Sequence, residues 1–376
     1  MSDTKTPAPA QEADPALLER LAAFVGAGAD RPGFYARHPI SHAVIGQMTD
    51  AVGDRNPIYS DEAYARTTIH KGLVVPPLWL FSWLMPGIEP EAEEDVLPDG
   101  TTYFNLLPSG QRQALASRRT IRDELNEVLE SHGYASPAVT NMTYTYLRYL
   151  RPGERPRFSS WIIDAVTGPK QTKLGSGFFV TMHMDVFVGD EQVATILQRY
   201  IRFRAPTAAP GAEPPALPAA PDTPVPVTQR GPSRTRTRET LRFSEVKVGD
   251  RLPTLVVRIT PTLVIAGALA SQDYQDVHHD FLIMPRRGHP RPFMNMMTTS
   301  GLLGRYLTDW TGPEAIVRAH ELRLMRPNYP GDTMTLNATV RETEVKDGRG
   351  LVTVDFNGVN SLGTHTDSSI VVELPL

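Results

Sequence analysis

The chain has 376 residues, 40% of them hydrophobic and 21% charged, which is enough for two folded cores of ordinary domain size. Its formal net charge of -4 gives no general electrostatic reason to expect nucleic acid or an anionic membrane surface as a partner. The sequence contains no cysteine, which excludes disulfides, thiolate metal sites and cysteine nucleophiles and suits a cytoplasmic protein.

The N-terminal residues 1–14 are polar and lack the basic start and apolar middle of a signal peptide. The apolar run from Val74 to Leu84 is too short to span a bilayer and is interrupted by Pro76 and Pro77. We therefore expect no membrane insertion and a protein that stays in the cytoplasm.

The first half of the chain, residues 15–205, mixes helical and strand-like patterns. An apolar helix is predicted over Ala43–Val52, and an acidic turn follows it, Gly53-Asp54-Arg55-Asn56-Pro57-Ile58-Tyr59. The other predicted elements are an apolar helix around Val74–Met85, a helix that Thr120 caps and Gly133 ends, a strand that ends at Arg151-Pro152, and strands over Phe178–Phe187 and Val193–Phe203.

Residues 206–238 divide the chain, because eight of the residues between 206 and 226 are proline and few are large and apolar. Such a segment buries too little surface to offset its ordering entropy, so it is typical of an extended linker. A crossover held along the surface of one compact body is an equally good interpretation.

The second half, residues 239–376, repeats the order of the first. Its elements are a helix over Leu263–Ala270, an acidic turn from Gln272 to His278, a helix over Met296–Trp310, a strand that ends at Arg326-Pro327, and strands over Leu351–Val359 and Ser369–Leu374. The helix that begins after Thr120 has no counterpart here. Two similar units of helices and strands predict a duplicated α+β fold.

Asp273 and His278 are the best candidates for chemistry, because they lie five residues apart across the turn that follows a helix. A carboxylate and an imidazole held together can orient a water, accept its proton and return a proton to a substrate carbon. A solvated surface turn rich in Asp and His is the competing interpretation of the spacing alone.

The stretch from Ser271 to Asp280 resembles the motif of the MaoC-type (R)-specific enoyl-CoA hydratases, roughly Gly-Asp-x-Asn-Pro-aliphatic-His. Asp273, Val277 and His278 match it, whereas Gln272, Gln275 and Asp276 depart from it in a way whose effect the sequence does not determine. The resemblance implies that Asp273 positions a water and that His278 is the general base. Residues 293–310 resemble the family's central helix, whose tip would stabilise an enolate oxygen, with the Gly301 amide as one donor.

The first half resembles the silent subunit of the two-chain hydratases of this family, and residues from about Phe243 resemble their catalytic subunit. Its turn keeps the Gly-Asp-x-Asn-Pro pattern, but Tyr59 stands where the histidine belongs, and tyrosine is a poor base near neutral pH. The resemblance implies a fusion with a double hot-dog fold, in which each unit is an antiparallel sheet wrapped around a helix. It also implies a thioester substrate, CoA-linked and with a bulky acyl group, and such a reaction needs no external cofactor. We expect a homodimer of such double units.

Six further residues are candidates for binding the substrate. Trp79 and Trp83 can line an acyl pocket, although their spacing fits an ordinary core equally well. Arg148, Arg151, Arg323 and Arg326, beside the two Arg-Pro turns, can meet CoA phosphates or stay solvated at the strand ends. The histidines at 278, 279 and 289 do not have the regular spacing of metal ligands, so no metal is expected.

Two other functions compete with the hydratase. A hot-dog thioesterase would use a carboxylate to activate water at the carbonyl, but His278 after Asp273 argues against it. A non-catalytic acyl-binding protein is consistent with the altered turn at Gln275 and Asp276. The sequence does not determine the acyl group, CoA or a carrier protein as the thiol, the direction of the reaction, or a degradative or biosynthetic role.

Overall fold

The computed structural model describes residues 14–85, 87, 95–96, 102–103, 119–172, 175–204, 234–287 and 289–376. Within these ranges no helix is both long enough and apolar enough to cross a lipid bilayer.

The first half folds into short helices and long strands. Its helices are α1 (Pro15–Ala22), α2 (His42–Val52), α3 (Glu62–Thr67) and α4 (Ile121–Ser131), with 3-10 helices η1 (Pro57–Tyr59) and η2 (Pro77–Leu84). Its strands are β1 (Phe34–Tyr35), β2 (Asp95–Val96), β3 (Thr102–Tyr103), β4 (Ser136–Tyr146), β5 (Arg157–Phe158), β6 (Ile162–Thr172), β7 (Gly175–Val188) and β8 (Glu191–Phe203).

The second half repeats this plan. Its helices are α5 (Arg234–Thr237), α6 (Pro261–Ala270) and α7 (Met296–Thr311), with 3-10 helices η4 (Phe243–Glu245), η5 (Asp276–His278) and η6 (Met284–Arg287). Its strands are β9 (Leu255–Arg258), β10 (Ile316–Leu324), β11 (Thr333–Lys346), β12 (Arg349–Asn360) and β13 (Gly363–Leu374).

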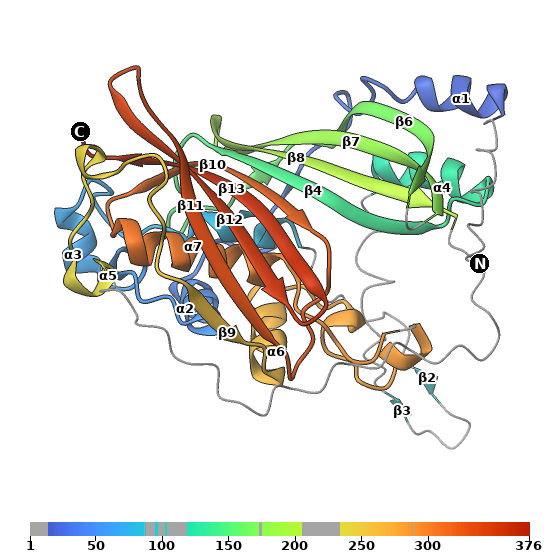
Figure 1. Ribbon diagram of the computed structural model, residues 1–376. Helices are drawn as coiled ribbons and strands as arrows, with labels where there is room; N and C mark the ends of the chain where they lie inside the picture. The colour runs from blue at the N-terminus through green and yellow to red at the C-terminus, as the bar shows by residue number, and fades with distance from the viewer. Residues whose placement is uncertain are drawn as a thin grey trace, which may run out of the picture.

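One antiparallel sheet of eleven strands runs through the described part of both halves. Its main path is β1-β5-β7-β8-β4-β10-β13-β12-β11-β9, β6 pairs with β7, and β2 and β3 form a separate small ladder. The halves meet where β4 pairs with β10, with Tyr144 opposite His320. Figure 1 shows the green strands of the first half beside the red strands of the second, with α2, α6 and α7 against one face.

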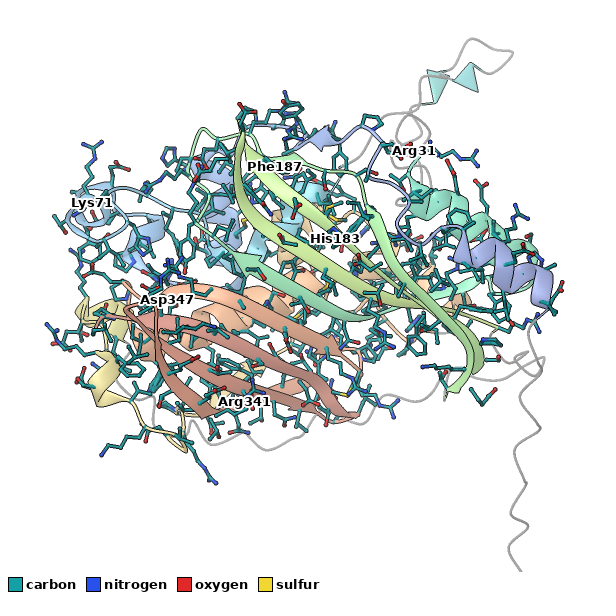
Figure 2. All side chains as sticks on the ribbon, turned by 90° about the horizontal axis from the view of Figure 1, so that it is seen from above. Arg31, Lys71, His183, Phe187, Arg341 and Asp347 are labelled. Carbon is teal, nitrogen blue, oxygen red and sulfur yellow. The ribbon has the colours of Figure 1, made fainter. Side chains whose placement is uncertain are left out.

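Residues along the strands alternate between the core and the outer face, as a sheet covered on one side requires. On β7, Met182 and Met184 are buried, whereas the side chain of His183 is partly exposed. In Figure 2, seen from above, His183 on β7 and Arg341 on β11 stand on the face that the helices leave open. The core therefore lies between the sheet and the helices.

The predicted helices over 43–52, 263–270 and 296–310 and the helix that follows Thr120 are confirmed, and the predicted strands over 178–187, 193–203, 351–359 and 369–374 are present but longer. The two strands predicted to end at the Arg-Pro turns end earlier, β4 at Tyr146 and β10 at Leu324. The segment around Val74–Met85 is different: it forms the 3-10 helix η2 instead of an α-helix. Pro76 and Pro77 explain its late start, because proline has no backbone N–H and disfavours α conformation in the residue before it.

The segment predicted as a linker over 206–238 lies mostly outside the described residues. Its last residues pack on the second half, where Thr235 donates a hydrogen bond to Asp309 Oδ1 at 2.9 Å. Arg238 forms an ion pair with Asp61 of the first half at 2.9 Å.

Side chains also join the halves on both sides of the β4–β10 contact. Arg305 of α7 donates a hydrogen bond to the Val52 carbonyl at 2.6 Å, and the Val317 amide donates to Tyr149 Oη at 2.6 Å. The two halves share a hydrophobic core that includes Trp79 and Leu302. The chain thus forms one body in which each half completes the other.

Candidate active site

The two acidic turns of the chain have the same backbone. Gly53 and Gln272 both adopt the left-handed conformation, with φ of 66° and 57°. The residue that follows each of them closes the helix end: Asp54 N donates to Thr49 O at 2.8 Å and Asp273 N to Ala268 O at 2.9 Å. A short 3-10 helix then follows in each half. Gln272 therefore preserves the turn, although it replaces the glycine of the family pattern.

Asp273 and His278 lie together in the core, with residue exposures of 3% and 6%. His278 Nε2 is 3.3 Å from Asp273 Oδ2, and His278 Nδ1 is 2.7 Å from the Phe293 carbonyl oxygen. Because a carbonyl only accepts hydrogen bonds, the proton sits on Nδ1 and Nε2 faces the carboxylate. Two acceptors face each other there, so a proton or a water molecule must bridge them. The arrangement can hold a water and take a proton from it.

Asn295 connects this pair to helix α7. As the N-cap residue it accepts a hydrogen bond from Thr298 N at 2.9 Å through Oδ1. Its Nδ2 donates to Asp273 Oδ2 at 3.2 Å and to Ser271 Oγ at 2.7 Å. The same amide thus satisfies the helix tip and orients the carboxylate.

The hydrogen bonds to Asp273 decide its ionisation. Burial acts to raise the pKa of this carboxyl, but the interaction with the His278 ring in its protonated form and the hydrogen bonds from two side-chain amides outweigh it and hold the pKa below its ordinary value. The second amide belongs to Gln275, whose Nε2 lies 3.1 Å from Asp273 Oδ1. Asp273 is therefore ionised at neutral pH, as a residue that holds a water must be.

The tip of α7 is next to this pair and has free donors. The first amides of an α-helix have no acceptor within the helix; Asn295 Oδ1 takes that of Thr298, and the Asn295 carbonyl takes that of Thr299. Among the described residues the amides of Met296 and Met297 have no acceptor, so they are available to a negative charge placed at the helix tip, together with the helix dipole.

Gly301 does not have the role that the sequence suggested. It lies inside α7, where its amide bonds to the carbonyl four residues earlier, so it cannot donate to an enolate. A β-carbon added at Gly301 would lie 2.5 Å from the ring of Trp79. Gly301 is needed so that the first half can pack against α7.

Helices α6 and α7 also approach closely at the site. A β-carbon added at Gly267 would lie 1.9 Å from Thr298 Oγ1, so only glycine allows α6 to pass the tip of α7. Ser271 Oγ donates to the Gly267 carbonyl at 2.7 Å and thereby holds the turn that carries Asp273.

A second buried histidine supports the helix tip from the sheet. His365 of β13 has its Nε2 3.0 Å from Thr299 Oγ1 and its Nδ1 2.5 Å from the Arg326 carbonyl. Burial lowers the pKa of His365 to about 4, so the ring is neutral at pH 7 and its Nε2 accepts a hydrogen bond from the Thr299 hydroxyl.

The corresponding turn of the first half lacks both parts of the site. Tyr59 replaces the histidine, and burial raises its pKa well above the ordinary value, so it cannot act as a base. The helix η2 begins at Pro76-Pro77, neither of which has an N–H to offer an oxyanion. The first half therefore has neither the histidine nor the helix-tip amides of the second half.

The six predicted substrate-binding residues do not gather around Asp273 and His278. Trp79 and Trp83 are core residues, with exposures of 1% and 4%. Arg148 forms ion pairs with Glu154 and Glu191.

The other three arginines also have contacts or positions away from Asp273 and His278. Arg151 donates to the His70 carbonyl at 2.5 Å, and the Arg326 carbonyl is bound by His365. Arg323 lines a groove of about 560 Å³ across β4 and β10–β13. This groove is on the outer face of the sheet, away from α7. A role for any of these residues with CoA remains a prediction.

Histidines 279 and 289 do not form a metal site: the described residues contain no group of three His, Asp or Glu side chains that could hold an ion. His289 Nδ1 instead lies 2.9 Å from Tyr329 Oη, and its ring packs on Phe293, which also touches His278. This aromatic cluster lies beside Asp273 and His278.

Sequence reasoning missed Asn295, although a signal was present. Asparagine immediately before an apolar helical pattern is a strong N-cap candidate. The Phe293 carbonyl that orients His278 carries no sequence signal, because any residue supplies a carbonyl.

Comparisons with known proteins agree with this architecture, although no family model matches the chain. Over 198 residues the chain is 35% identical to the 3-oxo-4,17-pregnadiene-20-carboxyl-CoA hydratase alpha subunit of Mycobacterium tuberculosis; the match covers 53% of this chain and 55% of the subunit. Over 127 residues it is 41% identical to the beta subunit of the same hydratase, covering 34% of this chain and 95% of the subunit. A solved MaoC-like dehydratase aligns with 95% of this chain and 100% of its own, with a TM-score of 0.64 and 18% identity, which supports the fold alone.

The continuous sheet, the central helix and the two matching turns define a double hot-dog protein. The chain belongs to the MaoC-type hydratase family, as its match to nearly the whole beta subunit shows, and it resembles a fusion of the alpha and beta subunits. It spans about half the length of the alpha subunit.

Proposed function

We propose that this chain is a hydro-lyase that adds water to a 2-enoyl thioester or removes it from the 3-hydroxyacyl thioester. The observation that carries the proposal is the buried pair of Asp273 and His278, with 3.3 Å between carboxylate and imidazole, beside the capped tip of α7. Few structural roles require an ionised carboxylate and an imidazole to be buried together at a helix tip.

The mechanism follows from the positions of these groups. Asp273 holds a water against His278 Nε2, which takes one proton as the oxygen attacks the β-carbon of the enoyl group. The electron pair moves to the thioester oxygen, where the Met296 and Met297 amides stabilise the enolate. His278 then returns the proton to the α-carbon. The Phe293 carbonyl stabilises the imidazolium that forms between the two steps.

The names of the two relatives support a CoA thioester with a bulky polycyclic acyl group as the substrate. The reaction needs no external cofactor, because the thioester itself acidifies the α-carbon. We further propose that the protein works as a homodimer in the cytoplasm.

The test is hydration of short, long and polycyclic enoyl-CoAs, followed by the loss of absorbance of the conjugated thioester. Asp273→Asn and His278→Ala should each lower kcat by about 100-fold or more, because the first removes the carboxylate that holds the water and the second removes the base that takes its proton. Tyr59→Phe, at the matching position of the silent half, should leave the rate unchanged and serves as the control. Unchanged rates in the Asp273 and His278 variants would show that the reaction takes place elsewhere.

A further inference from the structure

The two acidic turns carry an amide side chain at the same position but direct it to different partners. In the first half, Asn56 Oδ1 accepts a hydrogen bond from Ile58 N at 3.3 Å and caps η1, while Asn56 Nδ2 is buried without a partner among the described residues. In the second half, Gln275 makes no capping bond to η5, and its Nε2 donates to Asp273 Oδ1 at 3.1 Å. One extra methylene group moves the amide from the turn to the carboxylate.

This difference changes what each carboxylate receives. Asp54 Oδ1 accepts a hydrogen bond from the Asn56 backbone amide at 2.9 Å. Asp273 instead receives a side-chain amide on each oxygen: Gln275 on Oδ1, and Asn295 on the Oδ2 that faces His278. With Oδ1 held by Gln275, the carboxylate cannot rotate away from His278 without losing a hydrogen bond.

The two carboxylates, Asp273 and Asp54, also have different charged neighbours. His278 is the titratable group that acts on Asp273 from η5, and the groups that reach it from the turn and from the α7 cap are neutral amides. Asp54 is faced by Asp309 and Arg305 of α7 and by Arg55 of its own turn, and burial raises its pKa to about 6. The pKa of Asp273 is thus lowered mainly by His278, with further contributions from the side-chain amides of Asn295 and Gln275, whereas that of Asp54 is raised mainly by burial.

We propose that Gln275 is a positioning residue that holds Asp273 ionised and turned towards His278, an inference that rests on the proposed hydratase function. The glutamine is thus not a defect of the family motif but a replacement that exchanges the cap of η5 for a hydrogen bond to the catalytic carboxylate.

Two variants of Gln275 test whether its hydrogen bond to Asp273 has this role. Gln275→Met keeps the length of the side chain but removes the donor, and Gln275→Asn should return the amide to the turn, as in the first half. Asn56→Gln makes the reverse change in the silent half and is the matched control. The titration of Asp273 is followed by NMR of protein labelled with 13C at the aspartate carboxyl carbons and assigned with Asp273→Asn, and kcat and KM are measured in parallel.

In both Gln275 variants the midpoint of the Asp273 titration should rise by about one pH unit, because the charged form loses one donor. The value of kcat should fall by about 10-fold while KM changes by less than about twofold, since the lost bond acts through Asp273 and not on bound substrate. Asn56→Gln should change none of these quantities.

An unchanged titration in the folded Gln275→Met and Gln275→Asn proteins would overturn the proposal, whatever the activity. If wild-type protein hydrates no thioester but the titration moves as expected, the role of Gln275 stands and the proposed function fails. If the titration is unchanged while Asp273→Asn abolishes hydration, the function stands and the role of Gln275 is wrong.

Discussion

Gln272 has a left-handed backbone in a place where its counterpart in the first half is Gly53. A side chain with a β-carbon pays about 1 kcal/mol or more for this conformation. Two backbone hydrogen bonds hold Gln272 in this conformation: Gln272 N bonds to Leu269 O at 3.0 Å and Asp273 N to Ala268 O at 2.9 Å. Local strain is thus present one residue before Asp273, the proposed catalytic carboxylate.

Gln272→Gly should therefore raise the free energy of unfolding by about 1 kcal/mol, since glycine adopts this conformation without the β-carbon penalty. Chemical denaturation measured by circular dichroism checks the change. Gln47→Gly, within helix α2, is the control and should lower the free energy by about 1 kcal/mol. A loss of stability in Gln272→Gly would mean that the side chain makes contacts worth more than the strain.

At the scale of residues, contacts between neighbours in the sequence could be predicted, whereas contacts between distant parts of the chain could not. Asp273 and His278 are five positions apart on one turn, so their meeting follows from the turn alone. The place of Gly301 could not be predicted in the same way, because Trp79, which makes glycine necessary there, comes from the other half of the chain. The partner of Gln275 could not be predicted either, because it is the length of the side chain that decides whether the amide bonds to its own turn or to the carboxylate.

Among the elements, α7 combines two tasks at its first turn. Asn295 caps the helix with its oxygen and orients Asp273 with its nitrogen. The order of the site therefore depends on a single side-chain amide that bonds to both the helix and Asp273.

Asn295→Asp separates the two tasks. Aspartate is as good an N-cap as asparagine, so the bond to Thr298 N should be kept, and the thermal midpoint should fall only through the like charge buried beside Asp273. It donates nothing to Asp273 and places a like charge beside it, so kcat should fall by about 100-fold and the acid limb of the rate profile should move to higher pH. Asn295→Ala, which removes the cap as well, should in addition lose about 1 kcal/mol of stability. Full activity of Asn295→Asp would remove Asn295 from the site.

Elements with a regular apolar pattern, such as α2 and α7, could be predicted almost to their ends. The segment Pro77–Leu84 could not, because its composition is helical in hydrophobicity while its prolines and its packing against α7 impose a 3-10 form. This exception separates the two halves chemically: the helix start that provides amides in α7 is formed by prolines in η2.

For the whole molecule, the pairing of β4 with β10 unites two units that are far apart in sequence. No local pattern specifies this contact, and only the resemblance to paired subunits predicted that the two halves would join. At the junction Tyr144 stacks on His320, with ring centroids 5.6 Å apart, and both are buried.

Buried neutral histidines on this sheet should make the fold sensitive to acid. Burial lowers the pKa of His320 from 6.5 to about 3 and that of His365 from 6.5 to about 4. The stability is present in full above pH 6.5 and is lost as the pH falls towards the folded values, because the unfolded chain binds protons first. Asp54 acts in the opposite sense between about pH 4 and 6, since its folded pKa is raised.

Between pH 6.5 and about 4, the two histidines should lower the free energy of unfolding by about 2.7 kcal/mol per pH unit, before the opposing effect of Asp54. His320→Gln should flatten this slope by about half, and urea denaturation at a series of pH values measures it. A slope that His320→Gln leaves unchanged would contradict the burial of a neutral imidazole at the junction.

The fate of an oxygen atom from water tests the central claim most directly. Wild-type protein is incubated with an enoyl-CoA in water labelled with 18O, and the products are analysed by mass spectrometry. The label should enter a hydroxyl group on the acyl chain while the thioester to CoA stays intact, and Asp273→Asn and His278→Ala should abolish this incorporation. Label in a free acid with release of CoA would indicate a thioesterase, and thioester that binds without taking up label would indicate a protein that only binds it; either result contradicts the hydratase.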